Sequence, residues 1–126
     1  MIFKTRHFSR WSRKTSLSDE MLHRAVTEMA QGLIDADLGG GLFKKRIALP
    51  GRGKSGSVRT LLASNCGDRW IFIVGFEKNE RPNISDKELD ALKMVAKDLL
   101  ILTREQLQCA VADGTLQELS DAEKNE

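Results

Sequence analysis

The chain has 126 residues, of which 40% are hydrophobic and 30% are charged, and its formal net charge is +2. This length and composition are typical of one soluble domain and exclude a globally disordered protein, and the longest strongly apolar run, Trp70 to Phe76, is too short to span a bilayer. The charge is unevenly divided: residues 1–59 hold 12 Lys/Arg against 5 Asp/Glu, whereas residues 60–126 hold 8 against 13. A basic front half predicts a polyanionic partner.

The first part of the chain predicts a short strand and two helices. Residues 2–5 are compatible with a strand, and Phe8 and Trp11 stand three apart, as on one short amphipathic helix. Ser18 is predicted to cap a second helix, and the three glycines of residues 39–41 close this region. Apolar residues at helical spacing continue the second helix through Leu22, Ala25, Val26, Met29, Ala30 and Leu33.

Three strands are predicted next, over Leu42–Leu49, Val58–Ser64 and Trp70–Glu77. The turn-forming sequence of residues 65–68 predicts that the last two strands form an antiparallel hairpin. The third strand is apolar on both faces, which is typical of a central strand covered on both sides.

The rear of the chain predicts two helices and a tail. Ser85 begins a capping-box pattern ahead of a leucine-rich helix, and Thr103 begins another ahead of a shorter helix that Gly114 ends. Residues 120–126 are expected to form a charged, flexible tail. The predicted fold is therefore α+β: an N-terminal strand, two helices, three antiparallel strands that make a small antiparallel sheet, and two C-terminal helices.

The most informative motif is the basic, glycine-rich segment of residues 44–59. It holds six basic residues and three glycines, and no Asp or Glu occurs from Leu38 to Gly67. Arginine side chains and the backbone amides of glycine-rich loops bind phosphate oxygens, so the segment predicts a phosphate or nucleic-acid site. Strand alternation places Lys44 and Arg46 on one face and Lys45 on the other, among apolar residues. A solvated run of charges is the alternative.

Other chemistries are less compatible with the sequence. Gly53-Lys54-Ser55 resembles the end of a nucleotide-binding P-loop, but that motif requires a glycine where this chain has Ala48, and it opens a helix where this chain predicts a strand. Asp35 and Asp37 lie near glycines and are interpreted as loop and turn residues, not as a metal site.

The remaining titratable groups define the expected setting. His7 and His23 are interpreted as surface or helix residues, distant from the basic segment. Cys66 and Cys109 lack zinc-site spacing and predict free thiols in a reducing compartment. No apolar signal segment follows the basic first residues, so we expect a cytoplasmic protein without membrane contact, metal or cofactor.

Three segments carry a resemblance to a known family. They are Gly41-Leu42-Phe43-Lys44-Lys45-Arg46-Ile47, Gly53-Lys54-Ser55-Gly56-Ser57-Val58-Arg59, and Phe76-Glu77-Lys78-Asn79-Glu80-Arg81-Pro82-Asn83-Ile84-Ser85. In these segments the chain resembles the RelE/ParE superfamily of bacterial toxins, and most of all the HigB-like RelE toxins of type II toxin–antitoxin systems. The resemblance covers roughly residues 1–112 and implies a single RelE-like domain over residues 1–119.

The resemblance also implies a function: a ribonuclease that cuts messenger RNA, usually at the ribosome, so that translation is inhibited and growth arrests. A partner antitoxin is expected to hold it inactive. Carried over by position, the RNA- and phosphate-binding residues are Lys44, Arg46 and Arg52, and the catalytic residues are Lys54, Arg59 and Lys78.

The expected reaction is metal-free attack of an RNA 2′-hydroxyl on the neighbouring phosphate. Arg46, Arg52 or Arg59 would stabilise the charge that builds on the phosphoryl oxygens. Because neighbouring cations favour loss of a lysine proton, Lys54 or Lys78 is predicted as the base. The chain has no tyrosine; either Phe72 or Phe76 would stack on a base, but neither can transfer a proton.

Two other functions stay open at this point. A ParE-like inhibitor of DNA gyrase would share the fold without the nuclease residues. A non-catalytic, RNA-binding regulatory protein would bind RNA in a salt-sensitive way without cutting it.

Overall fold

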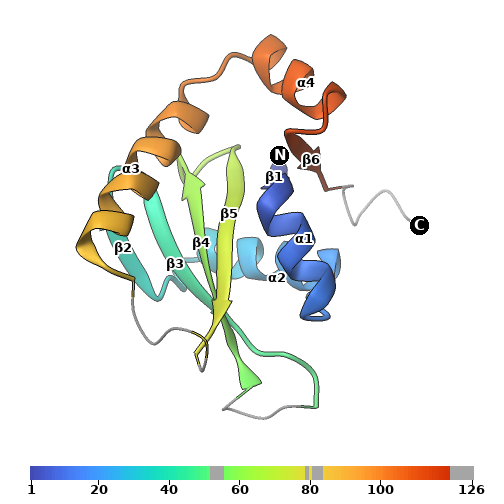
Figure 1. Ribbon diagram of the computed structural model, residues 1–126, viewed down its shortest axis with the longest axis vertical. Coiled ribbons are helices and arrows are strands. Elements are labelled where there is room, and N and C mark those ends of the chain that lie inside the picture. The colour runs from blue at the N-terminus through green and yellow to red at the C-terminus, as the bar shows by residue number, and fades with distance from the viewer. Residues whose placement is uncertain (52–55, 79, 81–83, 120–126) are drawn as a thin grey trace.

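The computed structural model describes residues 1–51, 56–78, 80 and 84–119, and it has the α+β architecture that the sequence predicts (Figure 1). The elements of these ranges follow one another along the chain as β1 (Ile2–Thr5), α1 (Arg6–Lys14), α2 (Asp19–Ala30), β2 (Ala36–Gly39), β3 (Leu42–Ile47), β4 (Val58–Ser64), β5 (Trp70–Glu77), α3 (Asp86–Leu100), α4 (Arg104–Ala112) and β6 (Leu116–Glu118).

The strands form one six-stranded sheet in the order β2-β3-β4-β5-β1-β6. All neighbours are antiparallel except β1 and β5, which are parallel, so the prediction of a purely antiparallel sheet is wrong. Two further strands were not predicted. β2 includes Asp37, which was expected in a loop or turn, and β6 follows α4 and pairs with β1.

Helices cover both faces of the sheet. On one face, α1 and α2 pack against Phe43, Leu62 and Phe72 in the largest apolar cluster. On the other face, α3 packs against Leu61 and Ile73, and α4 packs near β1 and β6. β5 is therefore covered on both sides, which confirms the interpretation of its all-apolar sequence. Within the described ranges no helix is long and apolar enough to cross a membrane.

The predicted helix caps are confirmed. The side chains of Ser18, Ser85 and Thr103 each accept a hydrogen bond from the backbone amide three residues later, and Thr103 completes a capping box with Gln106. α4 ends at Ala112, just before Gly114, whose φ of 86° is in the left-handed region that favours glycine.

The end of α2 differs from its prediction. The apolar spacing extends to Leu33, but α2 ends at Ala30 because Gly32 takes a φ of 97° and turns the chain. Leu33 is consequently 57% exposed, and its carbonyl accepts a hydrogen bond from the Nζ of Lys45 at 3.0 Å.

One arginine fixes α3 on the sheet. Arg69 directly precedes β5. Its Nη1 donates to the carbonyls of Leu99, Leu100 and Leu102 at 3.2, 3.0 and 2.8 Å. These carbonyls belong to the C-terminal end of α3 and the residues after it, where helical partners run out. Arg69 therefore holds one end of the helix whose other end borders the candidate site.

Candidate functional site

A hollow of about 110 Å³ lies on the sheet face that α3 covers, near the end at which β5 finishes. Strand register builds it: Arg59 of β4 stands opposite Phe76 of β5, and Lys44 of β3 stands opposite Leu61 of β4. α3 and the segment before it close one side. The residues that line the hollow are Leu38, Lys44, Arg59, Leu61, Phe76, Ile84 and Leu89.

Arg59 supplies this hollow with a buried hydrogen-bond donor that the described residues leave unused. β4 is buried along its length except at Arg59, which is half-buried and lines the hollow together with Leu89 of α3. Its Nη1 is buried and has no hydrogen-bond partner among the described residues. Buried polar groups are normally paired, so a buried cationic donor without a partner indicates a place where an anion binds.

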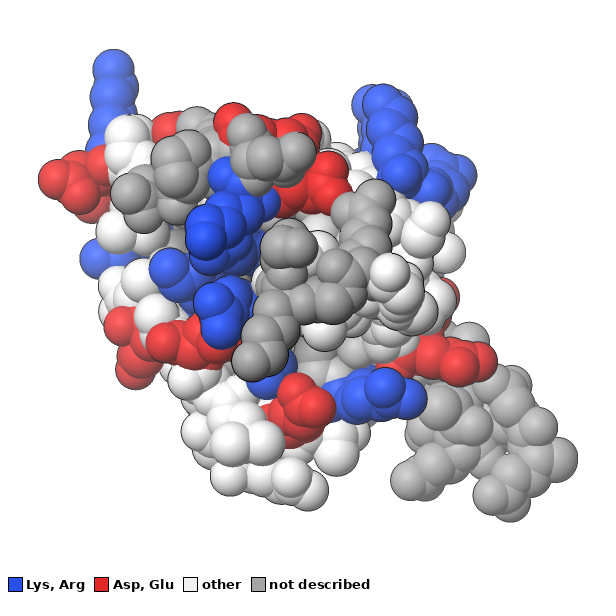
Figure 2. Space-filling view, turned by 90° about the horizontal axis from the view of Figure 1, so that it is seen from below, with Lys and Arg blue, Asp and Glu red and all other residues white. Residues whose placement is uncertain are grey.

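The rest of the hollow combines charge with apolar surface. Lys44 is half-buried and adds a second cation, whereas Phe76, Ile84 and Leu89 supply apolar and aromatic surface. Viewed from the end at which β5 finishes, Lys and Arg side chains gather on the surface with Asp and Glu around them (Figure 2). This combination fits a nucleotide, because the cations match its phosphate and an aromatic ring matches its base.

Arg46 lies beside this hollow but does not line it. In the β3–β4 pair Arg46 stands directly opposite Arg59, so the two side chains share a face of the sheet. Its side chain is 57% exposed, and its Nε lies 3.8 Å from Oδ1 of Asp35, whose Oδ2 also accepts a hydrogen bond from the Arg46 amide at 2.7 Å. Arg46 borders instead a second hollow of about 280 Å³ between α2 and the end of β3.

The predicted catalytic residues are only partly described. Lys78 is exposed and follows β5 directly; the pairing of Glu77 with Val58 puts it just past the last paired residues. Arg52 and Lys54 lie outside the described residues. The structure therefore brings Arg59 and Lys44 into one hollow, sets Arg46 opposite Arg59, places Lys78 just after the end of β5, and leaves the catalytic assignment a prediction.

The comparison with known families adds to this geometry. Residues 1–119 match a family described as the RelE toxin of the RelE/RelB toxin–antitoxin system. The chain belongs to the RelE toxin family. It is accordingly the toxin of a toxin–antitoxin system, and it has a cognate antitoxin as its partner. A search of the curated proteins finds no match.

In this RelE toxin, Lys45 has a structural place inside the fold. As alternation predicts, it lies on the face opposite to Lys44 and Arg46, and it is 7% exposed. Its Nζ lies 2.9 Å from Oε1 of Glu28 in α2, and Glu28 is the partner that the sequence pattern did not indicate. The pair joins α2 to β3 and removes Lys45 from any role in anion binding.

Only one of the two candidate stacking residues is in place. Phe76 lines the hollow of the toxin. Phe72 lies on the opposite face, fully buried against Phe8 with 5.2 Å between ring centroids, so the suggestion that it stacks on a base is wrong. Sequence reasoning also missed Ile84 and Leu89 as lining residues, because their approach to Arg59 depends on how α3 docks.

Within the described ranges no three His, Cys, Asp or Glu side chains come together as metal ligands would, and the metal-free expectation stays a prediction.

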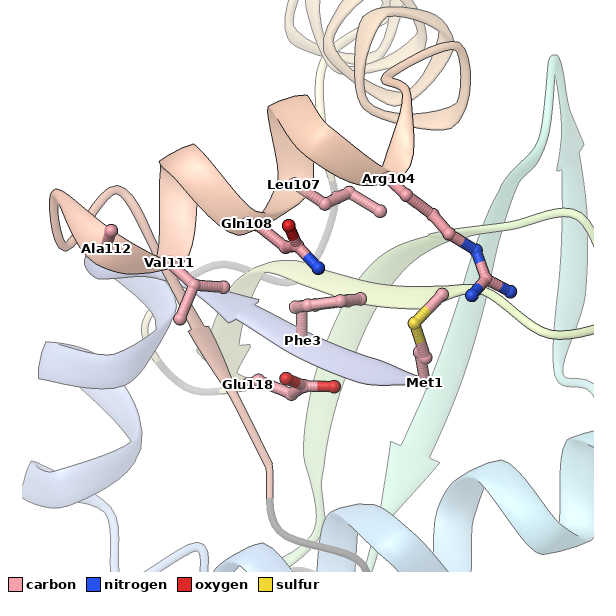
Figure 3. Close-up of a pocket in the computed structure, with 8 residues that line it drawn as sticks. All are labelled: Met1, Phe3, Arg104, Leu107, Gln108, Val111, Ala112 and Glu118. Carbon is pink, nitrogen blue, oxygen red and sulfur yellow. The ribbon is translucent and has the colours of Figure 1, made fainter.

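A larger hollow of about 310 Å³ lies between α4, β1 and β6 and contains no predicted site residue (Figure 3). Its walls are mostly apolar, with Phe3, Leu107 and Val111 around it and Arg104 at its border.

Proposed function

We propose that the protein is a metal-free endoribonuclease of the HigB-like type that cuts messenger RNA on the ribosome and so inhibits translation. The observation that carries this proposal is the buried Nη1 of Arg59, which finds no hydrogen-bond partner among the described residues and lies in a hollow shared with Lys44 and Phe76. A cationic donor without an internal partner is already desolvated and oriented before the substrate arrives, as stabilisation of a transition state requires.

The proposed reaction needs little more than positioning and charge. The scissile phosphate binds to Arg59 and Lys44, and a neighbouring base stacks on Phe76. The 2′-oxygen then bonds to phosphorus, its proton passes to a base, and the bond from phosphorus to the 5′-oxygen breaks. The products are a 2′,3′-cyclic phosphate and a 5′-hydroxyl, which takes up a proton as it leaves.

The proton acceptor is the second part of the proposal. His7 lies on α1, which covers the other face of the sheet, and His23 lies on α2 of that same face, so lysine is the better candidate. We keep Lys54 and Lys78 in this role and Arg46 and Arg52 as phosphate contacts around the hollow. Arg46 must leave Asp35 to take part, and its exposure of 57% allows this movement.

The test is a primer-extension map of transcript ends after induction without antitoxin. The wild-type protein is expected to create new 5′ ends inside coding regions, and Arg59→Ala is expected to lower their yield about 10²–10³-fold. Arg104→Ala serves as the matched control and should cut like the wild type, because Arg104 is an exposed arginine at the border of the hollow between α4, β1 and β6.

Two additional assays, chromosomal DNA breakage in the same induced cells and RNA binding to translating ribosomes at increasing salt, separate the rival functions. Unchanged cleavage by Arg59→Ala would refute the assignment of this residue. Broken DNA without new transcript ends would identify a ParE-like gyrase inhibitor, and salt-sensitive RNA binding without cleavage on translating ribosomes would identify a regulatory protein.

A further inference from the structure

The exposed face of α1 carries a row of cations that the proposed reaction does not use. Arg6, Arg10 and Lys14 follow one another at intervals of four residues, and Arg13 lies beside them, so the four form one stripe on the helix. All four are exposed. No Asp or Glu occurs between Met1 and Ser18.

This row is separate from the hollow around Arg59. α1 packs through Phe8 and Trp11 against the sheet face that carries Phe72, whereas Arg59 and Phe76 belong to the other face. A β-carbon at Gly75 would overlap the Trp11 ring, which shows how closely that ring lies on β5. The two basic surfaces therefore lie on opposite sides of the sheet and cannot bind the same phosphate.

The charges of the row are not neutralised within the described part of the protein. Arg10, Arg13 and Lys14 form no ion pair or hydrogen bond through their side chains with the described residues, while Arg6 donates to the carbonyls of Asp113 and Gly114. Like charges four residues apart destabilise a helix, and this helix also has no acidic residue in its first turn. Arg13 and Lys14 gain from the helix dipole in the last turn, but the repulsion along the row as a whole is relieved when an external polyanion binds.

The form of the row indicates which polyanion fits. From Arg6 to Lys14 the helix rises about 12 Å, a straight and rigid line of positive charge. Proteins that bind single strands add exposed aromatic rings on which bases stack, but the aromatic residues of α1, Phe8 and Trp11, face the sheet. A row of cations without a stacking ring contacts the phosphate backbone and not the bases. Proteins that bind duplex RNA typically contact it through its backbone.

We propose that the exposed face of α1 is a second RNA-binding surface, which binds the phosphate backbone of an RNA duplex through Arg10, Arg13 and Lys14. The choice of RNA over DNA rests on the proposed ribonuclease function; the existence of the surface rests on α1 alone. In the cell the surface anchors the toxin on structured RNA while the hollow on the other side takes up a single strand.

The experiment measures binding of the purified full chain to a fluorescein-labelled RNA duplex of 20 base pairs by anisotropy, between 50 and 200 mM KCl. The triple variant Arg10→Gln/Arg13→Gln/Lys14→Gln is expected to bind at least tenfold more weakly at 50 mM KCl. The slope of log K against log salt should fall in magnitude by about 2 to 3, at about 0.9 for each lost phosphate contact.

The matched control is Lys87→Gln/Lys97→Gln/Arg104→Gln, which removes the same charge from exposed positions of α3 and α4. It should keep the wild-type slope to within about 1, and circular dichroism should show both variants folded. An unchanged slope in the α1 variant, or an equal loss in the control, would overturn the proposal. Tighter binding of a DNA duplex of the same sequence would overturn the assignment to RNA.

The two proposals can fail independently. Transcript cleavage in cells that express Arg59→Ala reports on the hollow, and duplex binding by the purified α1 variant reports on the row.

Discussion

Replacing Arg59 by methionine should stabilise the protein while it abolishes function. Methionine keeps the length of the apolar stem, so packing against Phe76 and Leu61 is largely retained. The change removes a buried Nη1 that has no partner in the described part of the chain, and an unmade buried hydrogen bond costs about 1–3 kcal/mol.

Charge repulsion adds to this gain. Arg59 stands directly opposite Arg46 across the β3–β4 pair, and like charges in this position cost roughly 0.2–1 kcal/mol. With some loss of packing subtracted, we expect the free energy of unfolding to rise by about 1–3 kcal/mol. For a domain of this size that raises Tm by roughly 3–10 °C.

The assay is urea and thermal unfolding, followed by circular dichroism, of the wild-type toxin released from its antitoxin and of Arg59→Met. Arg104→Met is the control: Arg104 is exposed, so its replacement should change the free energy of unfolding by no more than about 0.5 kcal/mol. If Arg59→Met lowered stability by more than about 1 kcal/mol while the control did not, the guanidinium would have a stabilising partner. The inference of a free, preorganised donor would then be wrong.

Two further predictions concern α1 and Asp35. Gly75→Ala should destabilise the protein by about 1–3 kcal/mol, because the new methyl group overlaps the Trp11 ring. Gly67→Ala is the control, because its methyl group meets only the Asn65 side chain, with Oδ1 at 3.5 Å and Cγ at 3.9 Å. Equal urea midpoints for the two variants would contradict the close packing of Trp11 on β5. Asp35→Asn keeps an acceptor for the Arg46 amide but removes the charge that pairs with its guanidinium. It should tighten binding of a single-stranded RNA oligonucleotide up to about fivefold, since an exposed pair contributes at most about 1 kcal/mol, and weaker binding would contradict a role for Arg46.

Local signals in the sequence predicted the helices and the central strands. Ser18, Ser85 and Thr103 cap helices because a hydroxyl can accept from a free amide three residues on, and that depends only on neighbouring residues. The strands that were missed are short. β2 contains two polar or glycine positions in four residues, and β6 has three residues, so neither shows a clear alternation.

Long-range pairing was beyond the reach of the sequence pattern. Nothing in Ile2 to Thr5 indicates that its partners are β5 on one side and β6 on the other. The long-range contacts of the site were equally beyond the sequence pattern. Alternation correctly separated Lys45 from Lys44 and Arg46. The pairing of Lys45 with Glu28 and of Arg46 with Asp35, however, depends on how α2 and the turn after it lie on β3.

The position of β1 has a consequence for synthesis on the ribosome. Of the described strands, β1 leaves the exit tunnel before the others, yet it lies in the interior of the sheet between β5 and β6. It has no neighbour in the sheet until residues 70–77 emerge and no second one until Leu116–Glu118 emerge. Strands 3 to 5, which carry Lys44, Arg59 and Phe76, pair with one another locally and can assemble earlier. The nascent toxin therefore completes the described sheet only when β6 has been made, and until then the chain is only partly folded.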